Sequence, residues 1–98
     1  MQTFILLTKL TPELTKRMKD RSAIGGSWLE LVKEKCPEVK FIAHYALLGQ
    51  YDFLDIYEAP DVESAAKVAM ISQANGASQA ESLPAILYKD FLELVKEI

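Results

Sequence analysis

The sequence predicts an α+β sandwich in which helices cover one side of a four-stranded antiparallel sheet. Three observations support this prediction. Four β-rich runs cover residues 4–10, 39–48, 51–59 and 77–87. Helically spaced apolar residues separate the first run from the second and the third run from the fourth. The second and third runs are joined directly at Gly49-Gln50. With a helix after the last run, the order is the ferredoxin-like β-α-β-β-α-β pattern plus a C-terminal helix.

The first strand is expected at residues 4–10, which form a compact apolar run followed by Thr11-Pro12. Threonine accepts hydrogen bonds from the free N–H groups of a helix start, and proline suits the first helical position. A break is expected at residues 21–26, because Gly25-Gly26 is unfavourable inside a helix. A second helical stretch then runs from residue 28 to 36 and ends before a proline.

The hairpin between the two middle strands gives the most specific local prediction. Glycine at the first central position suits a two-residue type II′ turn, so we expect such a turn at Gly49-Gln50. Pairing Leu48 with Tyr51 then places other residues opposite each other. These expected pairs are Ala46–Phe53, His44–Asp55 and Ile42–Tyr57.

After the third strand, Asp61 is a good cap for a helix rich in small residues that stops at Asn75-Gly76. The last strand contains Pro84, which cannot donate a hydrogen bond to a neighbouring strand, so we expect this strand at a sheet edge. A terminal helix is predicted over residues 90–98. Its apolar side consists of Phe91, Leu94, Val95 and Ile98.

Both faces of the predicted sheet are apolar, and the helices can cover only one of them. We expect the more uniformly apolar set under the helices, namely Phe4, Leu6, Leu10, Phe41, Ala43, Tyr45, Leu54 and Ile56. The other face then holds Ile5, Leu7, Ile42, Phe53 and Tyr57 with Lys9, His44 and Asp55. Such an apolar face is unfavourable in water, so a second copy or another partner is expected to bury it.

Length, charge and composition exclude several classes of protein. The 98 residues make one domain, 1–98, with a net charge of −3. A mildly acidic chain lacks the basic surface that binds nucleic acid or anionic lipid. No apolar run approaches the about 20 residues of a membrane span, and the single Cys36 indicates no oxidising compartment. We therefore expect a cytoplasmic protein with no nucleic-acid or membrane partner. One histidine and one cysteine give no metal-ligand spacing, so neither a metal nor a cofactor is expected.

Residues 49–52, Gly-Gln-Tyr-Asp, resemble the motif of the GYD domain family. Glu58-Ala59-Pro60-Asp61 resembles the acidic end of that family's third strand, and the first strand ending in Lys9 extends the likeness over most of the chain. The resemblance implies a ferredoxin-like domain of the dimeric α/β-barrel group, in which two sheets face each other and enclose a barrel. It implies no particular activity.

The candidate catalytic residues are His44 and Asp55, which the expected hairpin register places side by side. An imidazole held by a carboxylate can act as a general base. Lys9, or alternatively Tyr57, would hold an anionic group or a developing oxyanion. The competing interpretation, which we favour, is a polar cluster that pairs across a dimer interface.

The candidate ligand-binding residues are Lys9, Tyr45, Tyr51, Asp52 and Tyr57. Lys9 is expected on the barrel-facing side and Tyr51 and Asp52 at the barrel mouth, while Tyr45 and Tyr57 are candidates to line a pocket. Each has a structural alternative. Tyr51 can pack beside the hairpin, Asp52 can accept hydrogen bonds from backbone N–H groups of the turn, and aromatic strand residues more often pack than bind.

Three functions stay open on the sequence alone. We favour a non-enzymatic module, a homodimer or larger homo-oligomer, that binds a small molecule or serves oligomerisation. The second is a small cofactor-independent enzyme of the dimeric-barrel monooxygenase or isomerase kind that uses His44 and Asp55. The third is a purely structural assembly protein whose barrel is filled by side chains. The ligand or substrate is not identified.

Overall fold

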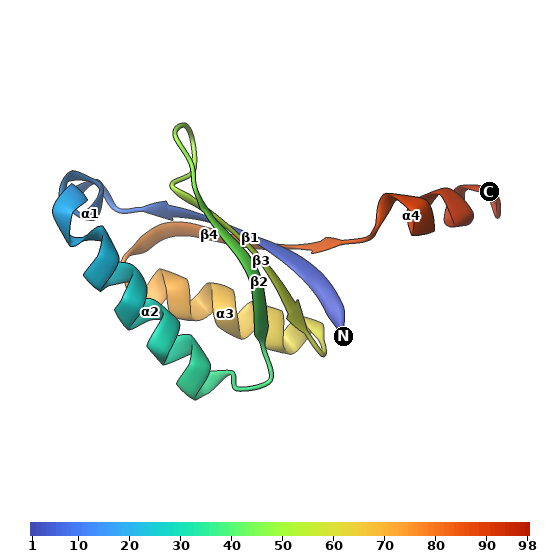
Figure 1. Cartoon of the computed structure of the whole chain (residues 1–98), viewed down its shortest axis with the longest axis horizontal. Coiled ribbons are helices and arrows are strands. Elements are labelled where there is room, and N and C mark those ends of the chain that lie inside the picture. The colour runs from blue at the N-terminus through green and yellow to red at the C-terminus, as the bar shows by residue number, and fades with distance from the viewer.

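All residues 1–98 are described in a computed structural model, which contains one four-stranded sheet (Figure 1). The strands are β1 (Gln2–Leu10), β2 (Lys40–Ala46), β3 (Phe53–Ala59) and β4 (Ala77–Ala85). The helices are α1 (Pro12–Lys16), the 3₁₀ turn η1 (Met18–Asp20), α2 (Arg21–Lys35), α3 (Val62–Ala74) and α4 (Tyr88–Val95). The strand order is β2-β3-β1-β4 and every neighbouring pair is antiparallel. The predicted ferredoxin-like fold is confirmed.

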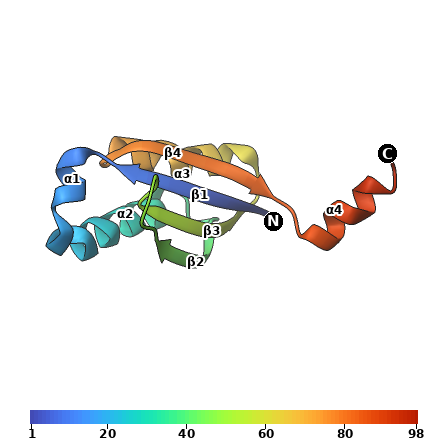
Figure 2. The same cartoon turned by 90° about the horizontal axis from the view of Figure 1, so that it is seen from above.

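The core lies between the sheet and helices α2 and α3, which cover one face of it (Figures 1 and 2). Phe4 and Leu6 of β1 pack there with Tyr57 of β3, Val32 of α2 and Val68 of α3, and all five are at most 1% exposed. The rings of Phe4 and Tyr57 stack with their centroids 5.6 Å apart. Burying each large side chain stabilises the fold by about 1.5–3 kcal/mol.

The opposite face of the sheet carries no helix, and its residues differ from those expected. Cross-strand partners share a face, and β1 pairs Leu6 with Asp55 and Leu7 with Leu54. The helix-covered face therefore includes Phe53, Asp55 and Tyr57 of β3 with His44 of β2. The open face holds Ala43, Tyr45, Leu54 and Ile56 with Ile5, Leu7 and Lys9.

The prediction for β1 is confirmed, and so is that for Phe41 of β2, which packs against the core. The prediction that put Ala43, Tyr45, Leu54 and Ile56 under the helices is wrong. The polar groups that replace them are buried with partners. Asp55 hydrogen-bonds to His44, and the Tyr57 hydroxyl donates to Ser82 Oγ at 2.8 Å. A buried polar group with a partner costs little compared with an unpaired one.

The β2–β3 hairpin keeps the predicted pairs His44–Asp55 and Ala46–Phe53. Its turn is longer than expected, because the last backbone bond runs from Leu47 N–H to the Asp52 carbonyl at 2.9 Å and encloses residues 48–51. A β-bulge also lies between Phe41 and Ala43. The extra residue in the bulge shifts the register, so Phe41 and not Ile42 pairs with Tyr57.

Helix α2 runs through the segment 21–26 where a break was expected. Gly25 and Gly26 lie inside it, and the interruption falls instead at Arg17, with φ −87° and ψ 62°. Glycine inside a helix costs about 1 kcal/mol relative to alanine. The tertiary contacts of α2 through Trp28 and Val32 override this local preference. The helix ends at Lys35, as the following proline predicted.

Both predicted helix caps are present. Thr11 Oγ1 accepts a hydrogen bond from the amide of Leu14 at 3.5 Å, and Asp61 Oδ1 accepts one from the amide of Ser64 at 2.8 Å. Helix α3 ends before Gly76, which has a φ of +108°. A Cβ atom there would lie 2.2 Å from Leu14 Cδ1, so only glycine fits this turn.

Strand β4 lies at a sheet edge, as Pro84 predicted, and leads through residues 86–87 into α4. The predicted terminal helix exists but begins at Tyr88, two residues earlier than expected. It points away from the body of the domain (Figures 1 and 2) and contains no buried side chain. The C-terminal segment therefore forms an arm, residues 86–98.

Candidate functional site

A small cavity lies between helices α2 and α3 and the helix-covered face of the sheet. Its volume is about 70 Å³, which is far below the about 300–1,000 Å³ of pockets for drug-sized ligands. Aromatic walls come from Trp28 and Phe53. The polar groups on its surface belong to Thr8, Arg21, His44, Asp55, Ser72 and Asn75. The cavity is large enough for a few water molecules or a small polar ligand.

The His44–Asp55 pair forms one wall of this cavity. The two residues are direct cross-strand partners, and Asp55 Oδ1 hydrogen-bonds to His44 Nδ1. The Asp55 side chain is 4% exposed and the His44 side chain is 56% exposed. The imidazole also stacks on Phe53, with ring centroids 5.5 Å apart. The carboxylate is thus anchored inside the protein, and it holds the imidazole at the mouth of the cavity.

The electrostatics of the pair are set by burial. Removal from water raises the pKa of the Asp55 carboxyl above its usual range, while the charge and the hydrogen bond of His44 act in the opposite direction. With Nδ1 bound to the carboxylate, His44 Nε2 has no hydrogen-bond partner in the chain. This arrangement fixes the orientation of the ring and leaves Nε2 to accept or donate a proton.

Arg21 is the cation of the cavity, a role that was not predicted from the sequence. Its guanidinium lies 5.4 Å from the centroid of the Phe53 ring and donates to the Thr15 carbonyl at 3.5 Å. Its Nε–H group is buried without an acceptor. Trp28 lies on the same helix and donates from Nε1 to Ser72 Oγ at 2.8 Å. Only the packing of α2 on the sheet brings these residues to His44, and no local pattern marks them.

Lys9 and Tyr45 do not join this site. Both lie on the open face of the sheet, whereas His44 and Asp55 lie on the helix-covered face. The expected cluster of Lys9, His44 and Asp55 on one face is therefore not formed. Tyr57 is on the same face as Asp55, but it is fully buried and does not line the cavity.

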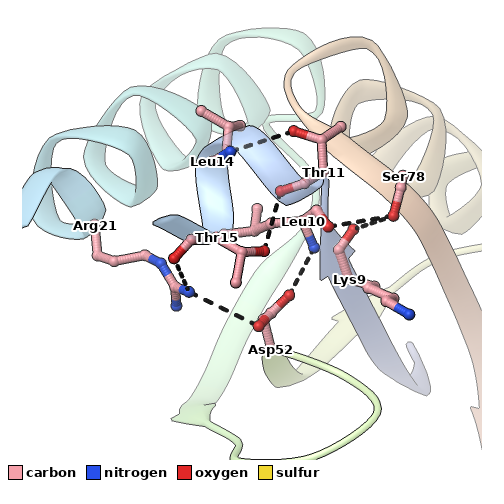
Figure 3. A network of polar contacts seen from close by, with 8 residues as sticks. All are labelled: Lys9, Leu10, Thr11, Leu14, Thr15, Arg21, Asp52 and Ser78. Atoms are coloured by element: carbon pink, nitrogen blue, oxygen red, sulfur yellow. Dashed lines mark hydrogen bonds and ion pairs between the residues drawn. The ribbon is translucent and has the colours of Figure 1, made fainter. Parts of the chain in front are cut away.

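Tyr51 and Asp52 hold the hairpin to its neighbours. Figure 3 shows Asp52 between Leu10 and Arg21: Oδ2 accepts a hydrogen bond from the Leu10 amide at 2.8 Å, and Oδ1 lies 3.8 Å from Arg21 Nη2. The Tyr51 hydroxyl donates to Glu81 of β4 at 3.1 Å. Desolvation raises the pKa of Tyr51, and the bond to Glu81 adds to this effect. Neither residue lines the cavity.

No group of three or more histidine, cysteine, aspartate or glutamate side chains comes together in a way that would hold a metal ion. None of the helices combines the length and the apolar character that crossing a membrane requires. The buried Cys36 is free, and burial raises the pKa of its thiol.

The fold and the site define a ferredoxin-like domain with one uncovered sheet face and, beneath its helices, a small and largely apolar cavity with a few polar groups on its wall. The chain belongs to the GYD domain family, whose model matches residues 4–95. It is 32% identical over 97 residues to the glutamine synthetase and cystathionine beta-lyase binding protein of Thermus thermophilus, and the match covers 98% of this chain and all of the relative. A crystal structure of a hypothetical protein from Pyrococcus horikoshii is also similar, with a TM-score of 0.49 and 20% identity over 89% of this chain and 92% of the other.

Proposed function

We propose that this protein is a homo-oligomeric module that pairs through the open face of its sheet and acts by binding other proteins. The apolar open face is the observation that carries the proposal. Ile5 and Leu7 of β1 lie directly beside Ile56 and Leu54 of β3, in the two central strands, and no helix covers them. A continuous apolar surface of this kind is typical of an interface.

A second copy of the chain is the occupant that fits this face best. The apolar centre is bordered by charges of both signs, including Lys9 near one end of the strands and Glu58 near the other. A two-fold axis brings the same surface of two copies together, so a face that carries both signs can pair its lysine with the partner's carboxylate. Dimerisation through the open sheet face is also what the dimeric-barrel group implies.

Binding of other proteins is supported by the relative from Thermus thermophilus, whose name states that it binds two enzymes. The proposal therefore favours protein partners over a metabolite.

The test is the mass of the protein in solution, measured by analytical ultracentrifugation. We expect wild-type protein at twice the chain mass of 11.0 kDa, or a higher multiple. Leu7→Lys should give a folded monomer, because a charge at the centre of an apolar interface is costly to bury. Met70→Lys is the matched control, since Met70 is 63% exposed on α3, outside the proposed interface. A monomeric wild-type protein would contradict the proposal.

Protein binding is tested separately by calorimetric titration of the wild-type protein with glutamine synthetase and cystathionine beta-lyase from the same organism. Heat of binding to either enzyme supports this half of the proposal. If the protein bound neither enzyme, the protein-binding half of the proposal would be contradicted.

One observation favours a second candidate function at the cavity. His44 Nε2 is free at the cavity mouth while Nδ1 is held by a buried carboxylate, and Arg21 supplies a cation nearby. This is the arrangement of an acid–base site for a small polar ligand.

A further inference from the structure

The arm, residues 86–98, has no surface to pack against within one copy of the chain. Sixteen large apolar side chains are exposed in the whole molecule, and eight of them lie in these thirteen residues. Phe91 and Val95 are 48% and 47% exposed, and Ile98 is fully exposed. The arm is thus the most concentrated exposed apolar segment of the protein.

Helix α4 and the residues that follow it carry their apolar and their charged side chains on opposite sides. With about 3.6 residues per turn, its apolar side chains share one side, with Phe91 and Val95 near the centre. The charged residues occupy the other side, and these are Lys89, Asp90, Glu93, Lys96 and Glu97. Helices shorter than about 12 residues are marginal in water. An eight-residue helix of this pattern therefore needs an apolar surface to stay folded.

The body of the same chain is poorly placed to supply that surface. Only Ile86 and Leu87 separate β4 from α4, and Leu87 has extended backbone angles, with φ −58° and ψ 138°. The helix consequently continues outward from the end of the strand (Figures 1 and 2). The arm also belongs to the domain itself, because the family match extends to residue 95.

The apolar residues of the arm continue the open face of the sheet. Leu83 of β4 lies on that face beside Ile5 and is 44% exposed. After Pro84 and Ala85, Ile86 and Leu87 lead to the apolar side of α4. A body that covers the open face therefore lies next to the arm as well.

We propose that α4 packs against the second copy of this chain, the copy that covers the open face. The arm of each copy then contacts the body of the other. This inference rests on the proposed function, because it takes the second copy from there. The central aliphatic side chains of the open face are already half-buried by their neighbours, whereas the large apolar side chains of the arm are 43% or more exposed. The arm consequently contributes a large share of the apolar surface that dimerisation removes from water.

The first test is the dimer dissociation constant, measured by sedimentation of full-length variants. Phe91→Asp/Val95→Asp should weaken the dimer by roughly tenfold or more, because two apolar side chains that the proposed dimer buries become charged. Lys89→Gln/Lys96→Gln makes the same change in net charge on the charged side, and it should leave the constant within about twofold. Neither pair contacts the core, so both variants should keep the fold of the body.

The second test identifies what the arm contacts. In a mixture of isotope-labelled and unlabelled wild-type protein, isotope-filtered NMR should show contacts from Phe91 and Val95 of one copy to the body of another. Contacts only within one copy, or an unchanged dissociation constant for Phe91→Asp/Val95→Asp, would overturn the arm inference and leave the dimer intact. A wild-type protein that is monomeric would overturn both this inference and the proposed function.

Discussion

The two faces of the sheet are built from alternate residues of the same strands, and they differ mainly in what covers them. Leu6 is fully buried under the helices, and its neighbour Leu7 is half-buried on the open face. The covered face holds polar residues such as Asp55, while the open face is apolar at its centre. Apolar character alone thus does not show which face a domain buries by itself. The open face has the apolar composition that is typical of the core of an interface.

The largest expected effect comes from truncating the two neighbouring leucines. Leu6→Ala should lower the free energy of unfolding by about 2–5 kcal/mol at every protein concentration, since it leaves a cavity in the core. Leu7→Ala should cost about 1 kcal/mol or less in the monomer and more at concentrations where the dimer forms. Urea unfolding at several protein concentrations measures both. If both variants lost the same free energy of unfolding at every protein concentration, the two faces would not differ in this way.

A smaller effect is expected at Asp52, which joins the hairpin to the end of β1. Asp52→Ala should lower the free energy of unfolding by about 1–3 kcal/mol, because the half-buried amide of Leu10 loses its acceptor. The comparison is Asp20→Ala, which breaks the ion pair between Asp20 and Arg17, both more than half exposed. Loss of this pair should cost less than about 1 kcal/mol. If the two variants were equally stable in thermal unfolding, Asp52 would not hold the hairpin.

The smallest effect is the pH dependence of folding stability, to which the carboxyls of Asp55 and Asp61 contribute with opposite signs. The raised pKa of Asp55 gives stability that is fully present below the pKa of the unfolded carboxyl and is lost as pH rises through the folded value. Hydrogen bonds from Ser64 lower the pKa of Asp61, so its contribution is present above the unfolded value and is lost as pH falls. Asp55→Asn should therefore gain stability relative to wild type as pH rises from about 4 to 7, and Asp61→Asn should not.

Carbon-13 NMR titration of the two carboxyls checks these signs directly. In wild-type protein, the midpoint of Asp55 should lie above the ordinary value of 3.8 and that of Asp61 below it. His44→Ala should raise the midpoint of Asp55 further, because both lowering effects of His44 are removed. If the midpoint of Asp55 were the same in wild-type protein and in His44→Ala, the pair would not exist in solution.

A small ligand that binds in the cavity should raise the melting temperature of wild-type protein but not of His44→Ala.

Features that depend on neighbouring residues were predictable from the sequence. The caps at Thr11 and Asp61 use a side chain and an amide three residues apart, and Pro84 marks the edge strand by its own chemistry. The pair His44–Asp55 was also predictable, because both residues lie in one hairpin. The length of the turn was not predictable in this way, because Asp52 accepts a hydrogen bond from the amide of Leu10 at the end of a different strand.

Features that depend on distant pairing were not predictable. The face that Asp55 occupies is set by its pairing with Leu6, far away in the sequence, and the two candidate faces were similarly apolar. The position of Arg21 in the cavity depends on where α2 packs, and the glycines after it indicated a break. Lys9 was consequently grouped with His44, although the sheet separates them.

The irregularities in the two outer strands bear on how far an assembly of this protein can grow. Strand β2 has a bulge at Ile42, and β4 contains Pro84, which has no N–H group. Both features hinder the addition of a further strand from another molecule. For the proposed homo-oligomer, we therefore expect association through the faces and not through the edges. Such an assembly would stop growing once the faces are filled, which disfavours fibres.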